Sequence, residues 1–159
     1  MGVTARDVMD TDFYTLKPDT PVPEAVRAFD EATRKLARRV FGMMVVNEHN
    51  ELVGMISMHD ILILMRPKHI HIWGEMTDIE VSGFVEEILL RVRSLVVGDL
   101  MTTEVITVTP DTHLLLLVDI MARKRIRRIP VIEAGKVIGI VHMSSVFFYL
   151  MNIFNSPGG

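Results

Sequence analysis

Cysteine is absent from this sequence, so disulfide bonds and thiolate metal ligands are excluded, and a reducing compartment is favoured. No apolar run approaches the roughly 18 residues that a membrane-spanning helix requires. Residues 1–12 alternate charged and apolar side chains and do not contain the apolar core of a signal peptide. These absences predict a soluble, cytoplasmic protein that does not enter a membrane.

The sequence also lacks the common catalytic motifs. No glycine pattern of the nucleophile-elbow type surrounds a serine, and no phosphate-binding P-loop is present. Since there is no cysteine, a thiol nucleophile is excluded as well. We therefore expect that the chain is not an enzyme.

Charge of one sign does not dominate the chain. The formal net charge is -3, which gives no overall reason to expect a nucleic acid or an acidic membrane as partner. A basic run occurs at residues 123–128, but no aromatic residues interleave it. A second basic group, within residues 34–39, lies near the corresponding helix end of the first half, where cations complement the helix dipole. The sequence therefore does not favour nucleic-acid binding.

What the chain does contain is an internal repeat. Hydrophobic residues make up 49% and charged residues 23%, as in a globular protein, and 159 residues allow one domain or two halves that share a core. Met9 matches Met101 at a displacement of 101 − 9 = 92, and residues 15–20 match residues 107–112 at the same displacement. The chain is therefore interpreted as two copies of one unit.

The repeat changes frame after its first helix. Gly54 matches Gly139 at a displacement of 139 − 54 = 85. Most of the difference lies between residues 20 and 43 (43 − 20 = 23 steps), because the equivalent residues 112 and 129 are only 129 − 112 = 17 steps apart. Insertions at a helix end or in a turn are the ones that a repeat tolerates.

Each copy has the pattern strand–helix–strand–strand–helix. In the first copy we predict strands at residues 13–16, 43–46 and 51–56, with a turn at 47–50. Its first helix is predicted to start with Thr20 as N-cap and Pro21 at the first helical position, where the missing N–H costs nothing. Helical spacing then places six residues on one face: Val22, Val26, Phe29, Thr33, Leu36 and Val40.

The second copy and the connector follow the same reasoning. Apolar spacing in the long connector predicts a helix from Asp78 or Ser82 to about Val96. In the second copy we predict a strand at 105–108, a helix from 111 to about 125, strands at 129–132 and 137–141 around a turn at 133–135, and a last helix.

A serine and an acid stand three residues apart where the last strand of the first copy meets its final helix. Ser57 and Asp60 fit a capping box, in which the serine caps the helix and the acid bonds back to the backbone of the serine. The second copy has Ser145 in place of Asp60, so only one copy keeps the carboxylate.

The final helix of each copy is apolar on nearly every side. Residues 61–65 read Ile-Leu-Ile-Leu-Met, and residues 146–151 read Val-Phe-Phe-Tyr-Leu-Met. A helix of this kind must be covered on more than one side, either within the monomer or by a second chain. We predict a homodimer.

These features resemble a tandem cystathionine-β-synthase (CBS) domain pair, also called a Bateman module. The resemblance rests on the entry segments 5–9 and 97–101, the segment 105–110, the segment 128–132, and the glycine-strand-helix stretches of both copies. No single motif is diagnostic, but their order, spacing and repetition agree over nearly the whole chain, apart from much of the connector.

The resemblance implies an α/β fold of two strand–helix–strand–strand–helix repeats related by a pseudo-two-fold axis. The first repeat would comprise residues 1–66, the connector with its helix residues 67–96, and the second repeat residues 97–155. Modules of this family bind adenine nucleotides or S-adenosylmethionine, and occur attached to enzymes, channels and transporters or as stand-alone proteins. The implied function is to sense AMP, ADP, ATP or S-adenosylmethionine and to relay a change of conformation to a regulated partner that the sequence does not identify.

The resemblance also implies where the ligand binds. In the family, the aspartate that leads a helix in one repeat holds the ribose hydroxyls, and the opening strand of the other repeat supplies a threonine. An ionised carboxylate can accept two hydroxyl donors, and a helix N-terminus offers free N–H groups to a phosphate. Carried over to this sequence, the binding residues are Ser57, His59, Asp60, Thr107, Arg127, Arg128, Ile129 and Pro130.

A mirror cleft would use Thr15, Met43, Met44, His142 and Ser145. The acid is missing there, and Gly-Met-Met replaces Arg-Ile-Pro. We therefore predict that this cleft is empty or takes a different ligand, which leaves one ligand site per chain.

Two other interpretations stay open. If Ser57 and Asp60 only cap a helix, the chain is a ligand-free dimerisation or scaffold module. His69 and His71 would lie on one side of a strand as half of a zinc or nickel site, for which Glu75 is the nearest further ligand. No complete metal site is predicted, and no catalytic cofactor.

Overall fold

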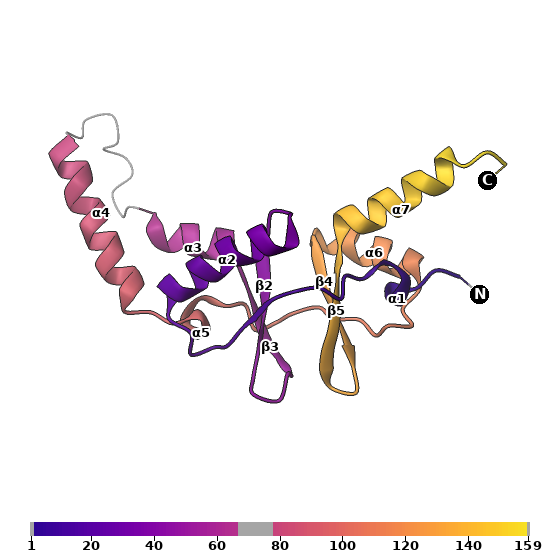
Figure 1. Ribbon diagram of the computed structural model, residues 1–159, viewed down its shortest axis with the longest axis horizontal. Coiled ribbons are helices and arrows are strands. Elements are labelled where there is room, and N and C mark those ends of the chain that lie inside the picture. The colour runs from indigo at the N-terminus through magenta and orange to yellow at the C-terminus, as the bar shows by residue number, and fades with distance from the viewer. Residues whose placement is uncertain (1, 67–77, 159) are drawn as a thin grey trace. The chain divides into compact units, whose positions relative to one another are not determined.

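The structure, a computed structural model, describes residues 2–66 and 78–158 (Figure 1). The chain forms two compact units, and each contains segments from both halves of the sequence. Unit 1 comprises residues 1–13, 49–52 and 105–159, and unit 2 comprises residues 14–48 and 53–104. The second repeat thus forms a unit with the start of the chain, whereas the first repeat forms a unit with the connector.

Unit 2 holds a three-stranded sheet and the helices of the first repeat. The strand order is β1-β2-β3, with β1 parallel to β2 and Thr15 opposite Met44. Every residue of β2 is buried, as expected of a central strand. The elements are β1 (Thr15–Leu16), α2 (Val22–Leu36), β2 (Gly42–Val46), β3 (Leu52–Ser57), α3 (Met58–Met65), α4 (Asp78–Arg93) and α5 (Val97–Leu100).

Unit 1 is built on an antiparallel hairpin. β4 and β5 pair with Ile129 opposite Val141, and the turn between them contains Ala134 and Gly135. These two residues have φ values of 50° and 78°, the left-handed conformation that a two-residue hairpin turn requires. The elements are α1 (Ala5–Val8), α6 (Leu114–Lys124), β4 (Arg128–Glu133), β5 (Lys136–His142) and α7 (Met143–Asn155).

Each unit is completed by the segment that precedes the other repeat. The N–H of Ala5 donates to the carbonyl of Thr112 at 2.8 Å, and the N–H of Val97 donates to the carbonyl of Thr20, also at 2.8 Å. Both bonds relate residues that are equivalent in the two repeats, at the displacement of 92 found in the sequence. The short helices α1 and α5 are therefore exchanged between the repeats.

The exchange continues into the sheets. Asp10 forms an antiparallel bridge with Ile140 in unit 1, and Thr102 forms the equivalent bridge with Met55 in unit 2. In each bridge both N–H groups donate to the opposite carbonyl, at 2.8–3.0 Å. The same contacts between an exchanged segment and a strand therefore occur in both units.

This exchange also corrects the predicted helix starts. Thr20 is not the N-cap of α2, because its carbonyl accepts from Val97; Pro21 takes the N-cap position and pairs with Val96. In the second copy α6 begins at Leu114 instead of residue 111. The carbonyl of Thr112, before α6, accepts the N–H of Ala5 in the same way. The side chain of His113 caps the helix by accepting the N–H of Leu115 at 3.0 Å.

The predicted strand at residues 105–108 is reduced to a single parallel bridge between Val108 and Val131. The N–H of Val108 donates to the carbonyl of Pro130 at 3.1 Å. Pro130 has no N–H with which to extend the pairing, whereas Met44 supplies one at the equivalent position of the first repeat. With this exception, both repeats follow the predicted order of elements.

The buried face of α2 differs from the predicted one. Val26 is 40% exposed, and the residues that α2 buries are Val22, Ala25, Phe29 and Ala32. Alanines let a helix approach a sheet closely, but their small side chains contribute little to an apolar pattern, so the pattern favoured Val26. The core of unit 2 contains Leu16, Ala25, Phe29, Ala32, Met43, Val45, Ile56, Ile61 and Val97.

Candidate functional site

Ser57 and Asp60 form a capping box at the start of α3. The N–H of Ser57 donates to Asp60 Oδ2 at 2.8 Å, and the Ser57 hydroxyl donates to the same oxygen at 3.0 Å. In return, the N–H of Asp60 donates to Ser57 Oγ at 3.2 Å. The predicted cap is thus confirmed, and it fixes the Asp60 carboxylate in one orientation beside a helix N-terminus.

The box leaves half of this carboxylate available. Oδ2 accepts both hydrogen bonds from Ser57, and no residue of 2–66 or 78–158 donates one to Oδ1. Asp60 is half-buried, and His59 beside it is exposed. An ionised carboxylate oxygen can accept two hydroxyl donors. Capping and ligand binding are therefore compatible at Asp60, because they use different oxygens.

The predicted residues of the second repeat also form a group. The bridge between Val108 and Val131 places Thr107 on the strand segment next to residues 128–130. Ile129 and Pro130 are buried, Arg128 is half-buried, and Thr107 and Arg127 are exposed. A ligand can therefore reach the side chains of Thr107 and Arg127, whereas Ile129 and Pro130 support the backbone.

The eight predicted residues thus fall into two sets, one in each unit. Ser57, His59 and Asp60 belong to unit 2, and Thr107 and residues 127–130 belong to unit 1. The structure brings the members of each set together. That the two sets meet in one cleft stays a prediction.

The start of α7 is built differently from the start of α3. His142 takes the N-cap position, and its side chain makes no capping hydrogen bond. Its Nε2 lies 3.3 Å from Asp10 Oδ2. Asp10 reaches this place because it pairs with Ile140 in the exchanged segment. A carboxylate therefore stands near the helix start of the second repeat, although Ser145 replaces the acid of the first repeat.

Asp10 is the residue near a predicted site that the sequence analysis missed. At the displacement of 92, Asp10 corresponds to Thr102 in the second copy. A charged residue at a position where the other copy has an uncharged residue is a sequence signal that could have pointed to Asp10. Its contact with His142 could not have been inferred, because it depends on the exchange of segments between the repeats.

Within residues 2–66 and 78–158, no three His, Asp or Glu side chains gather in a way that could hold a metal ion. His69, His71 and Glu75 lie outside the described residues. None of the described helices combines the length and the apolar character needed to cross a bilayer.

Comparison with known proteins identifies the family. The sequence profile of the CBS domain matches the chain twice, at residues 5–67 and 97–152. The chain therefore belongs to the CBS domain family, as the resemblance predicted. The two matches fall on the two repeats, and the predicted α/β CBS-pair fold is confirmed by structural comparison.

The CBS-pair protein CBSX2 from Arabidopsis thaliana has the same fold in its crystal structure. It is 26% identical, with a TM-score of 0.76, and the match covers 99% of this chain and 100% of that one. The crystal structure of CBSX2 in complex with AMP matches with a TM-score of 0.71 and 27% identity, over 97% of this chain and 100% of that one. This relative is thus a CBS pair that binds AMP.

Two curated relatives are longer than this chain. The chloroplastic CBS domain-containing protein CBSX1 of Arabidopsis thaliana is 30% identical over 149 residues, which cover 85% of this chain and 61% of CBSX1. The uncharacterized protein MJ1225 of Methanocaldococcus jannaschii is 26% identical over 136 residues, which cover 86% of this chain and 39% of that protein. The chain thus spans less than two thirds of the length of either relative.

Proposed function

We propose that the protein is a regulatory module that binds an adenosine-containing ligand between its two repeats, at one site per chain. AMP, ADP, ATP and S-adenosylmethionine are the candidates. The observation that carries the proposal is the state of Asp60, whose Oδ2 is held by the capping box while Oδ1 accepts no hydrogen bond from the described residues. The AMP complex of CBSX2 supports an adenine nucleotide as the ligand.

Each predicted residue has a distinct role in this proposal. Asp60 Oδ1 accepts the two ribose hydroxyls, and the N–H of His59 in the first turn of α3 faces a phosphate, since the N–H groups of Met58 and Asp60 already donate to the Phe41 carbonyl and to Ser57 Oγ. Arg127 and Arg128 add charge-assisted hydrogen bonds to the phosphate, because a guanidinium matches phosphate geometry. Thr107 supplies a hydroxyl from the second repeat. His59 is exposed next to Asp60 and contributes at the edge of the site.

The proposed relay follows from the two-sided site. A ligand that contacts both repeats favours the arrangement of the repeats that allows both sets of contacts. In a homodimer, that preference passes to the second chain and to the regulated protein. The size of the effect is limited by the difference in ligand affinity between the two arrangements.

A thermal-shift series with AMP, ADP, ATP and S-adenosylmethionine tests ligand binding. A ligand present at 100 times its dissociation constant stabilises the folded state by about 2.7 kcal/mol. For a domain of this size we expect the melting temperature to rise by roughly 5–10 °C with at least one of the four. The variant Asp60→Asn, which keeps the shape of the side chain but loses its charge, should lose most of that rise.

Asp99→Asn is the matched control. Asp99 caps α5 as Asp60 caps α3, accepting the N–H of Val96 at 2.9 Å, and no ligand role is proposed for it. Both variants should lose a similar, small amount of stability without ligand, but only Asp60→Asn should lose the shift. If no ligand shifts the wild type, the alternative of a ligand-free dimerisation or scaffold module is favoured, because the observed capping box alone explains Ser57 and Asp60.

A further inference from the structure

A cleft of about 570 Å³ opens at the edge of unit 1, beside the strand segment at Val108 that pairs with β4. Its walls combine apolar side chains of α6 and β4 with threonines from the segment before α6: Leu116, Ile120, Ile132, Thr109 and Thr112. None of the described residues that line it is charged. A cleft of this volume, mostly apolar with a few polar groups, has the character of a small-molecule site.

The two repeats differ where this cleft opens. Thr109 corresponds to Lys17 at the displacement of 92. In unit 2, Lys17 Nζ donates to the carbonyl of Asn47 at 2.8 Å, and so spans the space from the end of β1 to the end of β2. A threonine side chain is too short to make this bridge, so the equivalent space in unit 1 stays open.

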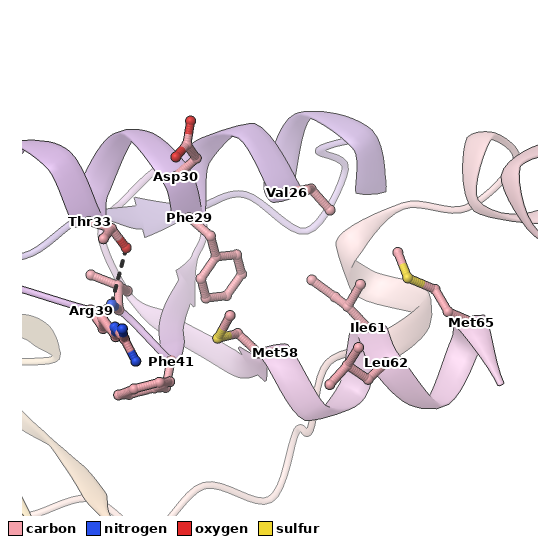
Figure 2. Close-up of a pocket in the computed structure, with 11 residues that line it drawn as sticks. Val26, Phe29, Asp30, Thr33, Arg39, Phe41, Met58, Ile61, Leu62 and Met65 are labelled. Atoms are coloured by element: carbon pink, nitrogen blue, oxygen red, sulfur yellow. Dashed lines mark hydrogen bonds between the residues drawn. The ribbon is translucent and has the colours of Figure 1, made fainter.

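The groove between α2 and α3 in unit 2 lies at a different place on the repeat (Figure 2). Phe29 of α2 lines that groove, whereas the cleft residues Leu116 and Ile120 correspond to Glu24 and Ala28, which do not. The second repeat thus carries two larger apolar side chains where the first has a glutamate and an alanine. Leu116 is left 50% exposed, so it is available to contact an apolar ligand.

The two threonines keep a hydrogen-bond donor for a ligand. Thr112 Oγ1 accepts the N–H of Thr109 at 3.2 Å, and the two hydroxyl oxygens lie 3.3 Å apart. Their mutual bond uses only one of the two hydroxyl hydrogens. The other hydrogen can therefore be donated to a ligand oxygen in the cleft.

An ion pair stands beside these threonines. Arg6 Nη2 lies 3.3 Å from Glu133 Oε1, and both side chains are half-exposed. The N–H of Arg6 donates to the carbonyl of Pro110, next to Thr109, and Glu133 directly precedes Ala134, which lines the cleft. An exposed ion pair of this kind contributes little to stability. A ligand that carries both charges can therefore replace each partner of the pair with its own group.

We propose that the cleft binds a free amino acid with an apolar side chain. The α-carboxylate pairs with Arg6 and accepts the hydroxyl hydrogen of the threonines, and the α-ammonium pairs with Glu133. The side chain lies against the apolar residues of α6 and β4. A ligand with a single charge would separate the ion pair and leave one of its members without a partner. This inference goes beyond the proposed function, with which it shares only Thr107 at the lining of the cleft.

Calorimetric titration of the full chain without nucleotide tests the site, with L-leucine as the probe. We expect saturation at one leucine per chain. Isocaproate lacks the ammonium group of leucine and isoamylamine lacks its carboxylate, while both keep its side chain. Each should bind about tenfold more weakly than leucine or worse, because each loses a hydrogen bond between charged groups.

Two variants locate the site. Thr109→Lys introduces the residue of the first repeat, so it should fill the cleft and abolish leucine binding. Thr103→Lys, at an exposed position outside the cleft, is the matched control and should bind leucine as the wild type does. Glu133→Gln should weaken leucine by about tenfold but leave isocaproate unchanged, since isocaproate has no ammonium group to lose a partner. Circular dichroism checks that each variant is folded.

The outcomes decide the site and the ligand class separately. An absence of leucine binding, or leucine binding that survives Thr109→Lys, overturns the site. Isocaproate or isoamylamine binding as tightly as leucine overturns the amino acid as ligand. If Thr109→Lys does not fold, Glu133→Gln decides, and an unchanged affinity for leucine overturns the proposal.

The proposed nucleotide site can fail independently of this one. Asp60→Asn should bind leucine like the wild type, and Glu133→Gln should keep the thermal shift with nucleotide. A wild type that binds leucine but no nucleotide therefore rejects only the proposed function, and the reverse result rejects only the amino-acid site.

Discussion

Gly139 lies so close to Met9 that a Cβ added to the glycine would come within 2.6 Å of the methionine sulfur and 3.1 Å of the Asp10 carbonyl oxygen. The first repeat has the same relationship between Gly54 and Met101. The two motifs that reveal the repeat in the sequence, a methionine at its entry and a glycine in its last strand, are therefore contact partners. The methionine that precedes one repeat packs on the glycine of the other.

Alanine at these glycines should be destabilising, and more so at position 54. A flexible methionine sulfur is the closest atom at both glycines, but the nearest backbone atom differs. A Cβ at Gly54 would lie 2.8 Å from the Thr102 carbonyl oxygen, whereas a Cβ at Gly139 would lie 3.1 Å from the Asp10 carbonyl oxygen. Overpacking of this kind costs about 1–3 kcal/mol. Urea denaturation should therefore give Gly54→Ala the larger loss and Gly139→Ala the smaller one.

Gly83→Ala is the control for the glycine series. Gly83 lies in α4, and a Cβ there would meet nothing within 4 Å. Alanine is the better helix former by about 0.8–1.0 kcal/mol, so this variant should match or exceed the wild type in stability. If all three variants behave alike, the close approach of the exchanged segments is not what selects glycine at positions 54 and 139.

The exchange of α1 and α5 predicts crossed effects in hydrogen exchange. Ala5 and Val97 occupy equivalent positions and are both fully buried. Ala5→Val overpacks unit 1, and Val97→Ala opens a cavity in unit 2, each at a cost of roughly 1–3 kcal/mol. We expect Ala5→Val to lower the protection of the amides of Leu114 and Ile140, and Val97→Ala that of Met55, by about 5- to 150-fold.

In neither case do the affected amides lie in the repeat that the substituted segment leads into along the chain. Ala5 precedes the first repeat, yet the amides expected to respond belong to the second, because Val3 and Asp10 accept from Leu114 and Ile140. Loss of protection in the first repeat alone after Ala5→Val would contradict the exchange. Equal loss in both units would show that they unfold together.

Ser57→Ala should lower the stability of the chain by about 0.5–2 kcal/mol. The substitution removes the oxygen that accepts the N–H of Asp60 and also one of the two donors to Asp60 Oδ2. Urea denaturation without ligand measures the loss. Ser144→Ala, at an exposed position in the first turn of α7, should stay within about 0.5 kcal/mol of the wild type. Equal losses in the two variants would contradict the capping role.

Local chemistry explains what could be predicted from the sequence. The capping box of Ser57 and Asp60, the hairpins and the order of elements all depend on residues a few positions apart, and these are found as expected. The repeat itself was visible because both copies keep the same residues at the same spacing. The capping box at the start of α3 was therefore predicted with its geometry.

The exchange of segments could not be predicted in the same way. The bonds from Ala5 to Thr112 and from Val97 to Thr20 join backbone groups, which every residue carries, so no side-chain pattern marks them. The displaced starts of α2 and α6 and the contact of Asp10 with His142 all follow from this exchange.

The proposed single ligand per chain rests on a difference between the two helix starts. At α3, one oxygen of Asp60 is available in a fixed orientation, whereas at α7 the acid is replaced by Ser145 and the neighbouring carboxylate of Asp10 lies 3.3 Å from His142. A ribose at α7 would meet no acid at the position of Asp60, and the nearby Asp10 carboxylate already contacts His142. Calorimetric titration with the nucleotide that gives the largest thermal shift should therefore saturate at one per chain. Asp60→Asn should abolish that binding and Ser145→Ala should leave it unchanged, since only the acid binds the sugar. Saturation at two per chain, or weaker binding by Ser145→Ala, would show that the second repeat holds a ligand without the acid.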